Sequence, residues 1–210
     1  TDIPKMENAE VADLMARFEP LVKHFNRYLT IGGFPELALS DDDLYAQRML
    51  REDVVDKVIK RDVLTLFKVR SPLLMEKLFL YLCMNSTEIF SATTAAKELD
   101  NISPNTIESY VDALVKSNLI YMAYPIAVGS KSVLKGRPKI YIADAAIRNA
   151  VLMVDDVLSD ERELGLLIET TVYKHLVSFY QGTGAQLGYY RKAKENQREV
   201  DAVIELPKQK

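Results

Sequence analysis

The sequence has few cysteines and histidines and no long apolar run. Cys83 is the single cysteine among 210 residues, so an intramolecular disulfide is impossible. A buried thiol in a reducing, cytoplasmic compartment is expected. The two histidines, His24 and His175, lie on separate predicted helices and lack the paired spacing of a zinc site. No apolar stretch is long enough to span a bilayer, so no membrane partner is expected.

Further absences limit the classes of function. The phosphate-binding motif G-x-x-x-x-G-K-[ST] does not occur, so the chain cannot hold a triphosphate in that way. The net charge is only −3, which predicts no overall attraction to nucleic acid or anionic lipid. The chain starts without methionine or a signal peptide, and it stops four residues after a predicted strand. We therefore expect it to be a portion of a longer protein.

What is present is typical of a globular protein, with 48% hydrophobic and 27% charged residues. We predict a mainly α fold with a small α/β part, in three units: a helical segment (1–70), a winged helix (71–144) and an α/β unit (145–210). In the first unit, apolar residues recur at three- and four-residue steps, as in an amphipathic helix that Pro20 divides. These residues are Val11, Leu14, Met15, Phe18, Leu21, Val22, Phe25 and Leu29.

The middle unit has the element order of a winged helix-turn-helix. Helices are predicted over 73–82, 91–100 and 104–117, and strands over 119–126 and 139–144. The loop between the strands is basic and would neutralise a few DNA phosphates. Its candidate nucleic-acid-binding residues are Lys131, Lys135, Arg137 and Lys139. However, Glu108 and Asp112 on the last helix would repel phosphates, so a winged helix used for packing or partner contact is favoured over direct DNA binding.

The last unit places one acid on a helix and another on a strand. Glu169 borders the apolar stripe of a helix predicted over 165–181, and Asp201 lies in the second strand of a hairpin (186–191 and 198–206). Such a pair is able to hold Mg²⁺ through oxygen ligands. A further acid and a lysine from a following strand are missing, so two surface carboxylates are the alternative. The edge of the final strand, if unpaired, would favour self-association.

The ordered series of motifs resembles the C-terminal half of a family of prokaryotic predicted ATPases of the AAA superfamily. The segments that carry the resemblance are YLTIGGFPE (28–36), VIKRDVL (58–64), ISPNTIESYVDALVKSNLIY (102–121), RPKIYIADAAIRNAV (137–151), GLLIETTVYKHL (165–176) and REVDAVIE (198–205). The resemblance implies a nucleotide-binding module that precedes this chain. It also implies that residues 1–70 form a helical lid or linker segment, that 71–144 form a winged helix, and that 145–210 form a partial restriction-endonuclease-like α/β domain.

The resemblance also implies roles for particular residues. Gly33 and Pro35 look like the glycine-x-proline turn of the ATPase lid, whose proline abuts the bound base. Glu169 and Asp201 look like the helix acid and the strand acid of the nuclease-like fold. The intact protein would bind ATP and Mg²⁺, whereas this portion, without its nucleotide-binding module, would bind neither and would be inactive alone. A stand-alone winged-helix module that binds DNA or protein and a Mg²⁺-dependent nuclease are the alternative functions.

Overall fold

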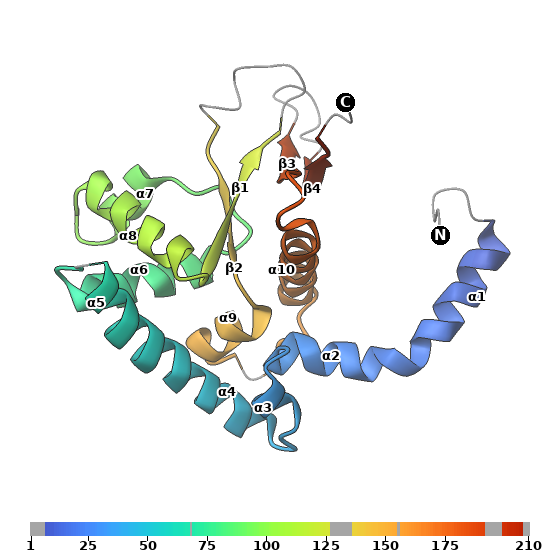
Figure 1. The fold of residues 1–210 in the computed structure, drawn as a ribbon. Coiled ribbons are helices and arrows are strands. Elements are labelled where there is room, and N and C mark those ends of the chain that lie inside the picture. The colour runs from blue at the N-terminus through green and yellow to red at the C-terminus, as the bar shows by residue number, and fades with distance from the viewer. Residues whose placement is uncertain (1–6, 68, 127–135, 155, 192–198, 208–210) are drawn as a thin grey trace.

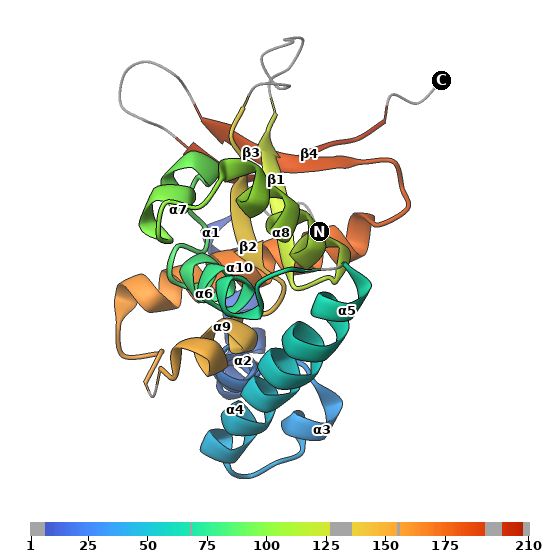
Figure 2. The same ribbon diagram turned by 90° about the vertical axis from the view of Figure 1, so that its left-hand side faces the viewer.

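The fold of this computed structural model is mainly helical with one small sheet, as predicted (Figures 1 and 2). The structure describes residues 7–67, 69–126, 136–154, 156–191 and 199–207. Within them, no helix combines the length and the apolar character that crossing a bilayer requires. Cys83 is buried, as predicted, and burial raises the pKa of its thiol.

An N-terminal arm projects from the body of the molecule (Figure 1). It consists of α1 (Asn8–Phe18), the 3₁₀ turn η2 (Glu19–Leu21) and α2 (Val22–Ile31). Pro20 lies in the 3₁₀ turn between the two helices, as predicted, because a proline is tolerated in the first turn of a helix. Only the last part of α2 reaches the body, where Leu29 and Ile31 are buried.

The next helical stretch runs along the edge of the body. It comprises α3 (Pro35–Ala38), α4 (Asp43–Arg51), the π-helical segment η3 (Glu52–Val63) and α5 (Leu64–Leu66). Asp42 caps α4, since its Oδ1 accepts a hydrogen bond from the backbone N–H of Tyr45 at 2.9 Å. The predicted helix over 41–69 is therefore observed, with a wider, π-helical middle.

Three helices and an antiparallel hairpin follow in the predicted order. They are α6 (Pro72–Met84), α7 (Ala92–Glu98), α8 (Pro104–Lys116), β1 (Ile120–Pro125) and β2 (Lys139–Ile142). Their apolar faces form most of the main core. The last elements are α9 (Ala145–Leu152), α10 (Glu161–Tyr180), β3 (Gln186–Arg191) and β4 (Glu199–Glu205).

One mixed sheet connects the middle of the chain to its end. Its strand order is β2-β1-β3-β4, with β1 antiparallel to β2 and parallel to β3. β3 and β4 form the predicted C-terminal hairpin. The helix α10 lies against this sheet, and Tyr173 on α10 packs with Tyr141 on β2 and Tyr189 on β3. Residues of β2, β4 and α10 are thereby brought to one place.

Candidate functional site

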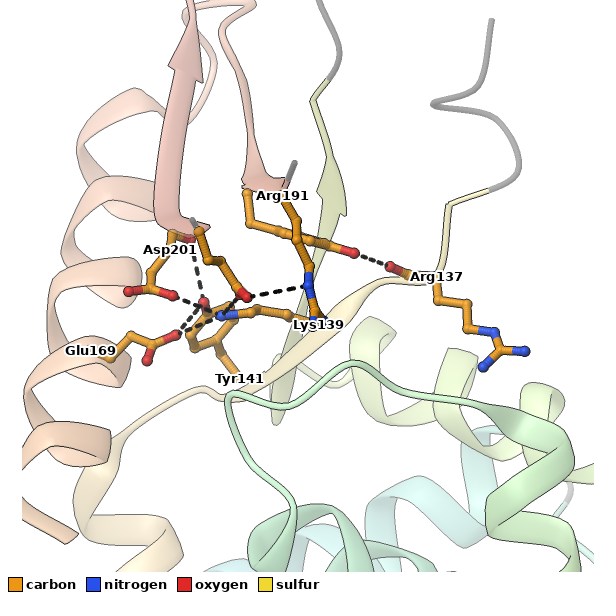
Figure 3. A network of polar contacts seen from close by, with 8 residues as sticks. Arg137, Lys139, Tyr141, Glu169, Arg191 and Asp201 are labelled. Atoms are coloured by element: carbon orange, nitrogen blue, oxygen red, sulfur yellow. Dashed lines mark hydrogen bonds and ion pairs between the residues drawn. The ribbon is translucent and has the colours of Figure 1, made fainter. Parts of the chain in front are cut away.

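Lys139, the first residue of β2, lies at the centre of an ion-pair cluster (Figure 3). Its ammonium Nζ is 2.5 Å from an oxygen of Glu199, 2.8 Å from one of Asp201 and 3.4 Å from one of Glu169. The lysine side chain is only 7% exposed, whereas that of Asp201 is 53% exposed. Three carboxylates from α10 and β4 thus surround one buried cation from β2.

Tyr141 supports the cluster from the same face of β2. Its hydroxyl donates a hydrogen bond of 2.7 Å to Glu169 Oε1, and a longer one of 3.4 Å to the carbonyl oxygen of Asp201. Its ring stacks on that of Tyr173 with centroids 4.1 Å apart and an interplanar angle of 7°. Burial raises the pKa of Tyr141 and raises that of Tyr173 to about 12, so both phenols stay neutral.

The charges of the cluster influence one another. Burial raises the pKa of Glu169, although its contacts with Tyr141 and Lys139 oppose this shift. Burial also acts to lower the pKa of Lys139, but hydrogen bonds to Asp201 and Glu199 outweigh it, and the net shift is upward. Lys139 therefore stays a cation at neutral pH. It serves as a fixed charge and not as a proton acceptor.

A cavity of about 530 Å³ opens beside these acids. Glu169, Asp201 and Tyr141 line it on one side, and Ile168 and Val172 contribute apolar walls. A small polar group has room there next to a carboxyl group whose pKa is raised by burial. The site therefore combines an accessible opening, a fixed ammonium and a protonatable acid.

The structure brings Glu169 and Asp201 together but does not arrange them for a divalent cation. Both carboxylates already contact the ammonium of Lys139, which occupies the position between them. Among the described residues, no group of three histidine, cysteine, aspartate or glutamate side chains is placed to hold a metal ion. In this arrangement Glu169 and Asp201 do not fit Mg²⁺. They are not two separate surface charges either, because both contact the same lysine.

The role of Lys139 in nucleic-acid binding stays a prediction, and in this structure its side chain is not exposed for such a contact. Its side chain points into the cluster and is buried, because α10 and β4 cover the face of β2 on which it lies. Arg137 is exposed, and its carbonyl oxygen accepts a hydrogen bond of 2.8 Å from the Tyr189 hydroxyl. Lys131 and Lys135 lie outside the described residues. The predicted basic contact surface is thus reduced to Arg137 within the described part.

Sequence reasoning missed Lys139, Tyr141 and Glu199 as members of the cluster. The signal was the two-residue period of strands, which places Lys139 and Tyr141 on one face of β2 and Glu199 and Asp201 on one face of β4. That period gives the face of each strand but not what covers it. The structure places a lysine beside Asp201, and this lysine comes from β2, which precedes β4 in the chain.

The outward face of α8 lines a groove of about 1230 Å³. Glu108 and Asp112 lie on one wall, and Tyr180 at the end of α10 lies among the residues that line it. Asp112 pairs with Lys116 at 2.6 Å, which leaves Glu108 as the acid without an ion-pair partner in the described residues. The acidic face of α8 lines this groove, and its negative charge disfavours contact with DNA phosphates.

The turn at residues 32–35 packs against the beginning of α9. Gly32 adopts φ 77° and ψ −172°, a conformation that is essentially confined to glycine. A Cβ at Gly32 would lie 2.8 Å from Asp144 Oδ1. Gly33 and Pro35, the predicted lid residues, are both exposed beside this fixed point. Pro35 is therefore exposed to solvent, three residues after a glycine that packs tightly against Asp144.

Asp144 connects that turn to two helices. Its Oδ1 accepts a hydrogen bond of 2.9 Å from the N–H of Ala146 and caps α9, and its other oxygen pairs with Lys174 of α10. Lys174 also donates a hydrogen bond of 2.9 Å to the hydroxyl of Tyr28 in α2. Burial acts to lower the pKa of Lys174, but Asp144 outweighs it and the pKa is raised.

Comparison with known proteins identifies a family. The profile of a domain of unknown function, DUF8612, matches residues 22–158, which is more than half of the chain. The chain belongs to this family. The match extends from α2 through the helices and the β1–β2 hairpin to α9, and it includes the fixed turn and Lys139. No solved structure matches the chain.

Three curated relatives are longer proteins. The chain is 30% identical to uncharacterized protein MJ1637 of Methanocaldococcus jannaschii over 80% of its own length and 35% of the relative's. It is 25% identical to uncharacterized protein MJ1544 of the same organism, over 74% and 34%. It is 28% identical to uncharacterized protein Rv2008c of Mycobacterium tuberculosis, over 83% and 39%. The chain thus spans between 34% and 39% of the length of these relatives.

Proposed function

We propose that this chain is the regulatory and effector portion of a longer ATP-binding protein of the AAA superfamily. A separate nucleotide-binding module would supply ATP and Mg²⁺, and its nucleotide state would act on this portion through the turn at Gly33–Pro35. The length of the relatives supports this proposal, because this chain corresponds to only about a third of each. The resemblance of YLTIGGFPE (28–36) to an ATPase lid turn supports it independently.

The observation that carries the proposal is the connection from the turn to Asp144. A change in the position of Pro35 would displace Gly32, whose backbone lies against Asp144. Asp144 in turn caps α9 and pairs with Lys174 on α10. Because α9 is buried among α2, α4 and α6, it would pass the displacement on to the main core. A nucleotide-dependent contact at an exposed proline would thereby reach both the predicted winged helix and the ion-pair cluster.

Replacing Pro35 with alanine in the longer protein tests this coupling. We expect the Michaelis constant for ATP to rise roughly fivefold, the effect of losing an apolar contact of about 1 kcal/mol. Pro104 is the matched control, because it is also exposed and also the first residue of a helix. Steady-state ATP hydrolysis measures both variants. Unchanged kinetics in Pro35→Ala, or an equal change in Pro104→Ala, would remove Pro35 from the mechanism.

A second candidate function is a protein-binding module of the winged-helix type. The groove along α8 favours protein over DNA as the partner, since its wall carries Glu108 and Asp112 next to exposed aromatic residues such as Tyr124. In this reading the α6–α8 helices and the β1–β2 hairpin bind a partner without any nucleotide-driven change. A binding partner whose affinity is the same with and without nucleotide would support this function over the first.

For the alternative function, a Mg²⁺-dependent nuclease, we expect this chain to be inactive. Because the ammonium of Lys139 lies between Glu169 and Asp201, we expect no Mg²⁺-dependent nicking of supercoiled plasmid by this chain. Asp201→Asn is the control variant, and it should give the same background as the unchanged chain. Nicking that depends on Mg²⁺ and is lost in Asp201→Asn would contradict this expectation and restore the nuclease function.

A further inference from the structure

The N-terminal arm presents an apolar stripe that no described part of the chain covers. Neither α1 nor η2 contains a buried residue. Met15 is 66% exposed, Phe18 is 54% exposed and Phe25 is 41% exposed. Leu21 and Val22 are about half exposed, at 52% and 50%. Side chains of this size on one helical stripe are normally covered by another helix.

The charges along the arm are distributed unequally. Residues 7–13 carry three acids, Glu7, Glu10 and Asp13, and no basic residue, whereas residues 20–31 carry Lys23 and Arg27 and no acid. One residue of each sign, Arg17 and Glu19, lies between these two parts. Asp13 pairs with Arg17 within α1 at 2.6 Å, and both side chains are well exposed. Two such arms side by side in the same direction would align like charges. In opposite directions, the acidic part of each would face the basic part of the other.

We propose that the arm pairs with the arm of a second copy of this chain, antiparallel and about a two-fold axis at Phe18. This register places Val11 opposite Phe25, Leu14 opposite Val22 and Met15 opposite Leu21. Every apolar residue of the stripe then meets another apolar residue. The interface is self-complementary, as a two-fold interface has to be.

The same register also places residues of opposite charge next to each other. Asp13 lies opposite Lys23, and Arg17 lies opposite Glu19, on each side of the two-fold axis. A parallel pair would set each of these residues beside its own copy. The charge pattern therefore selects the antiparallel pair, and the apolar stripe supplies most of its affinity. Projection of the arm from the body leaves room for the second copy (Figure 1).

Analytical ultracentrifugation of the full chain over a range of concentrations tests the proposal. We expect a concentration-dependent dimer that Phe18→Glu weakens by at least roughly 30-fold, the loss typical of a central interface residue. Circular dichroism and thermal unfolding of the dilute monomer should not change, because Phe18 is exposed and outside the core. Phe179→Glu is the matched control, since Phe179 is an exposed phenylalanine (77%) at the far end of α10. A chain that stays monomeric, or equal weakening by Phe179→Glu, overturns the proposal.

Charge exchange tests the orientation separately. Lys23→Asp should weaken the dimer by roughly three- to tenfold, because it places two acids opposite each other. The double variant Asp13→Lys with Lys23→Asp should restore the affinity. In addition, a mixture of Val11→Cys and Phe25→Cys chains should form a mixed disulfide, whereas Cys83 stays protected by burial. Disulfides only between identical variants, or no rescue by the exchange, would overturn the antiparallel pair.

Discussion

Replacing Lys139 with methionine is expected to lower the free energy of unfolding by about 3–5 kcal/mol, the usual loss when one partner of a buried ion pair is removed. Methionine keeps the length and apolar stem of the lysine, so packing changes little. The loss arises because Glu169 and Glu199, whose side chains are only 24% and 25% exposed, keep their charges without a cation between them. Chemical denaturation followed by circular dichroism measures this difference.

The effect of Lys139→Met is expected to depend on pH. The folded-state pKa of Lys139 lies above its ordinary value of 10.5, so its stabilisation is fully present below pH 10.5 and is lost as the pH rises through the folded value. In acid the carboxylates become protonated, and the variant no longer carries unpaired charges. The difference between the variant and the unchanged chain should therefore be largest at neutral pH and shrink on acidification. The decrease should begin above pH 4.5, the ordinary pKa of Glu169, because burial raises that pKa.

Arg191→Met is the matched control for this prediction. Arg191 approaches Glu199 at 3.8 Å, but its side chain is 40% exposed, so its loss should cost less than about 1 kcal/mol. The comparison separates the effect of burial from the mere presence of an ion pair. A Lys139→Met variant as stable as the unchanged chain at neutral pH would contradict the buried cluster.

Gly32→Ala is expected to destabilise the chain by about 2–4 kcal/mol, the second largest effect that we predict. One part of the cost is backbone strain, because residues with a Cβ avoid φ 77° with ψ near 180°. The other part is steric. The new Cβ would lie 2.8 Å from Asp144 Oδ1 and 3.0 Å from the Cβ of Ala146, both in the tightly packed start of α9.

Gly182→Ala is a control for an alanine at positive φ without the steric contact. Gly182 has nearly the same φ, 76°, but a Cβ there would meet no atom within 4 Å. We expect a loss of about 1 kcal/mol at Gly182, from backbone strain alone. Thermal and chemical unfolding of both variants give the comparison. Equal losses at the two glycines would show that contact with Asp144 does not hold the turn, and the route from Pro35 to α9 would lose its basis.

The sequence predicted most elements because their signals are local. Apolar periodicity located the helices and strands of the middle unit, and Asp42 marked the beginning of α4 through a cap within three residues. The helix α10 begins at Glu161, before the predicted 165, because Asp160 caps it by accepting hydrogen bonds from two backbone N–H groups. This cap is a local signal that the sequence carries, since Asp160 lies directly before the helix.

The positions of acids on a helix and on a strand were also readable, since each depends on its own element. Their proximity in the folded chain was not readable from the sequence. Lys139 is 30 residues from Glu169 and 62 residues from Asp201, and the contacts form only because α10 and β4 pack over β2. A lysine next to a basic loop looks like any surface lysine until its neighbours in space are known.

The sequence by itself determined the mainly α fold class, the order of elements, the apolar stripe of the arm and the glycine-rich turn. Each of these follows from residue type and spacing along a few turns of chain. Only the tertiary structure decided that Lys139 is buried among three acids, that Gly32 abuts Asp144 and that the arm projects uncovered. The physical reason is that burial and charge pairing depend on which distant segments pack together, and local spacing does not encode that.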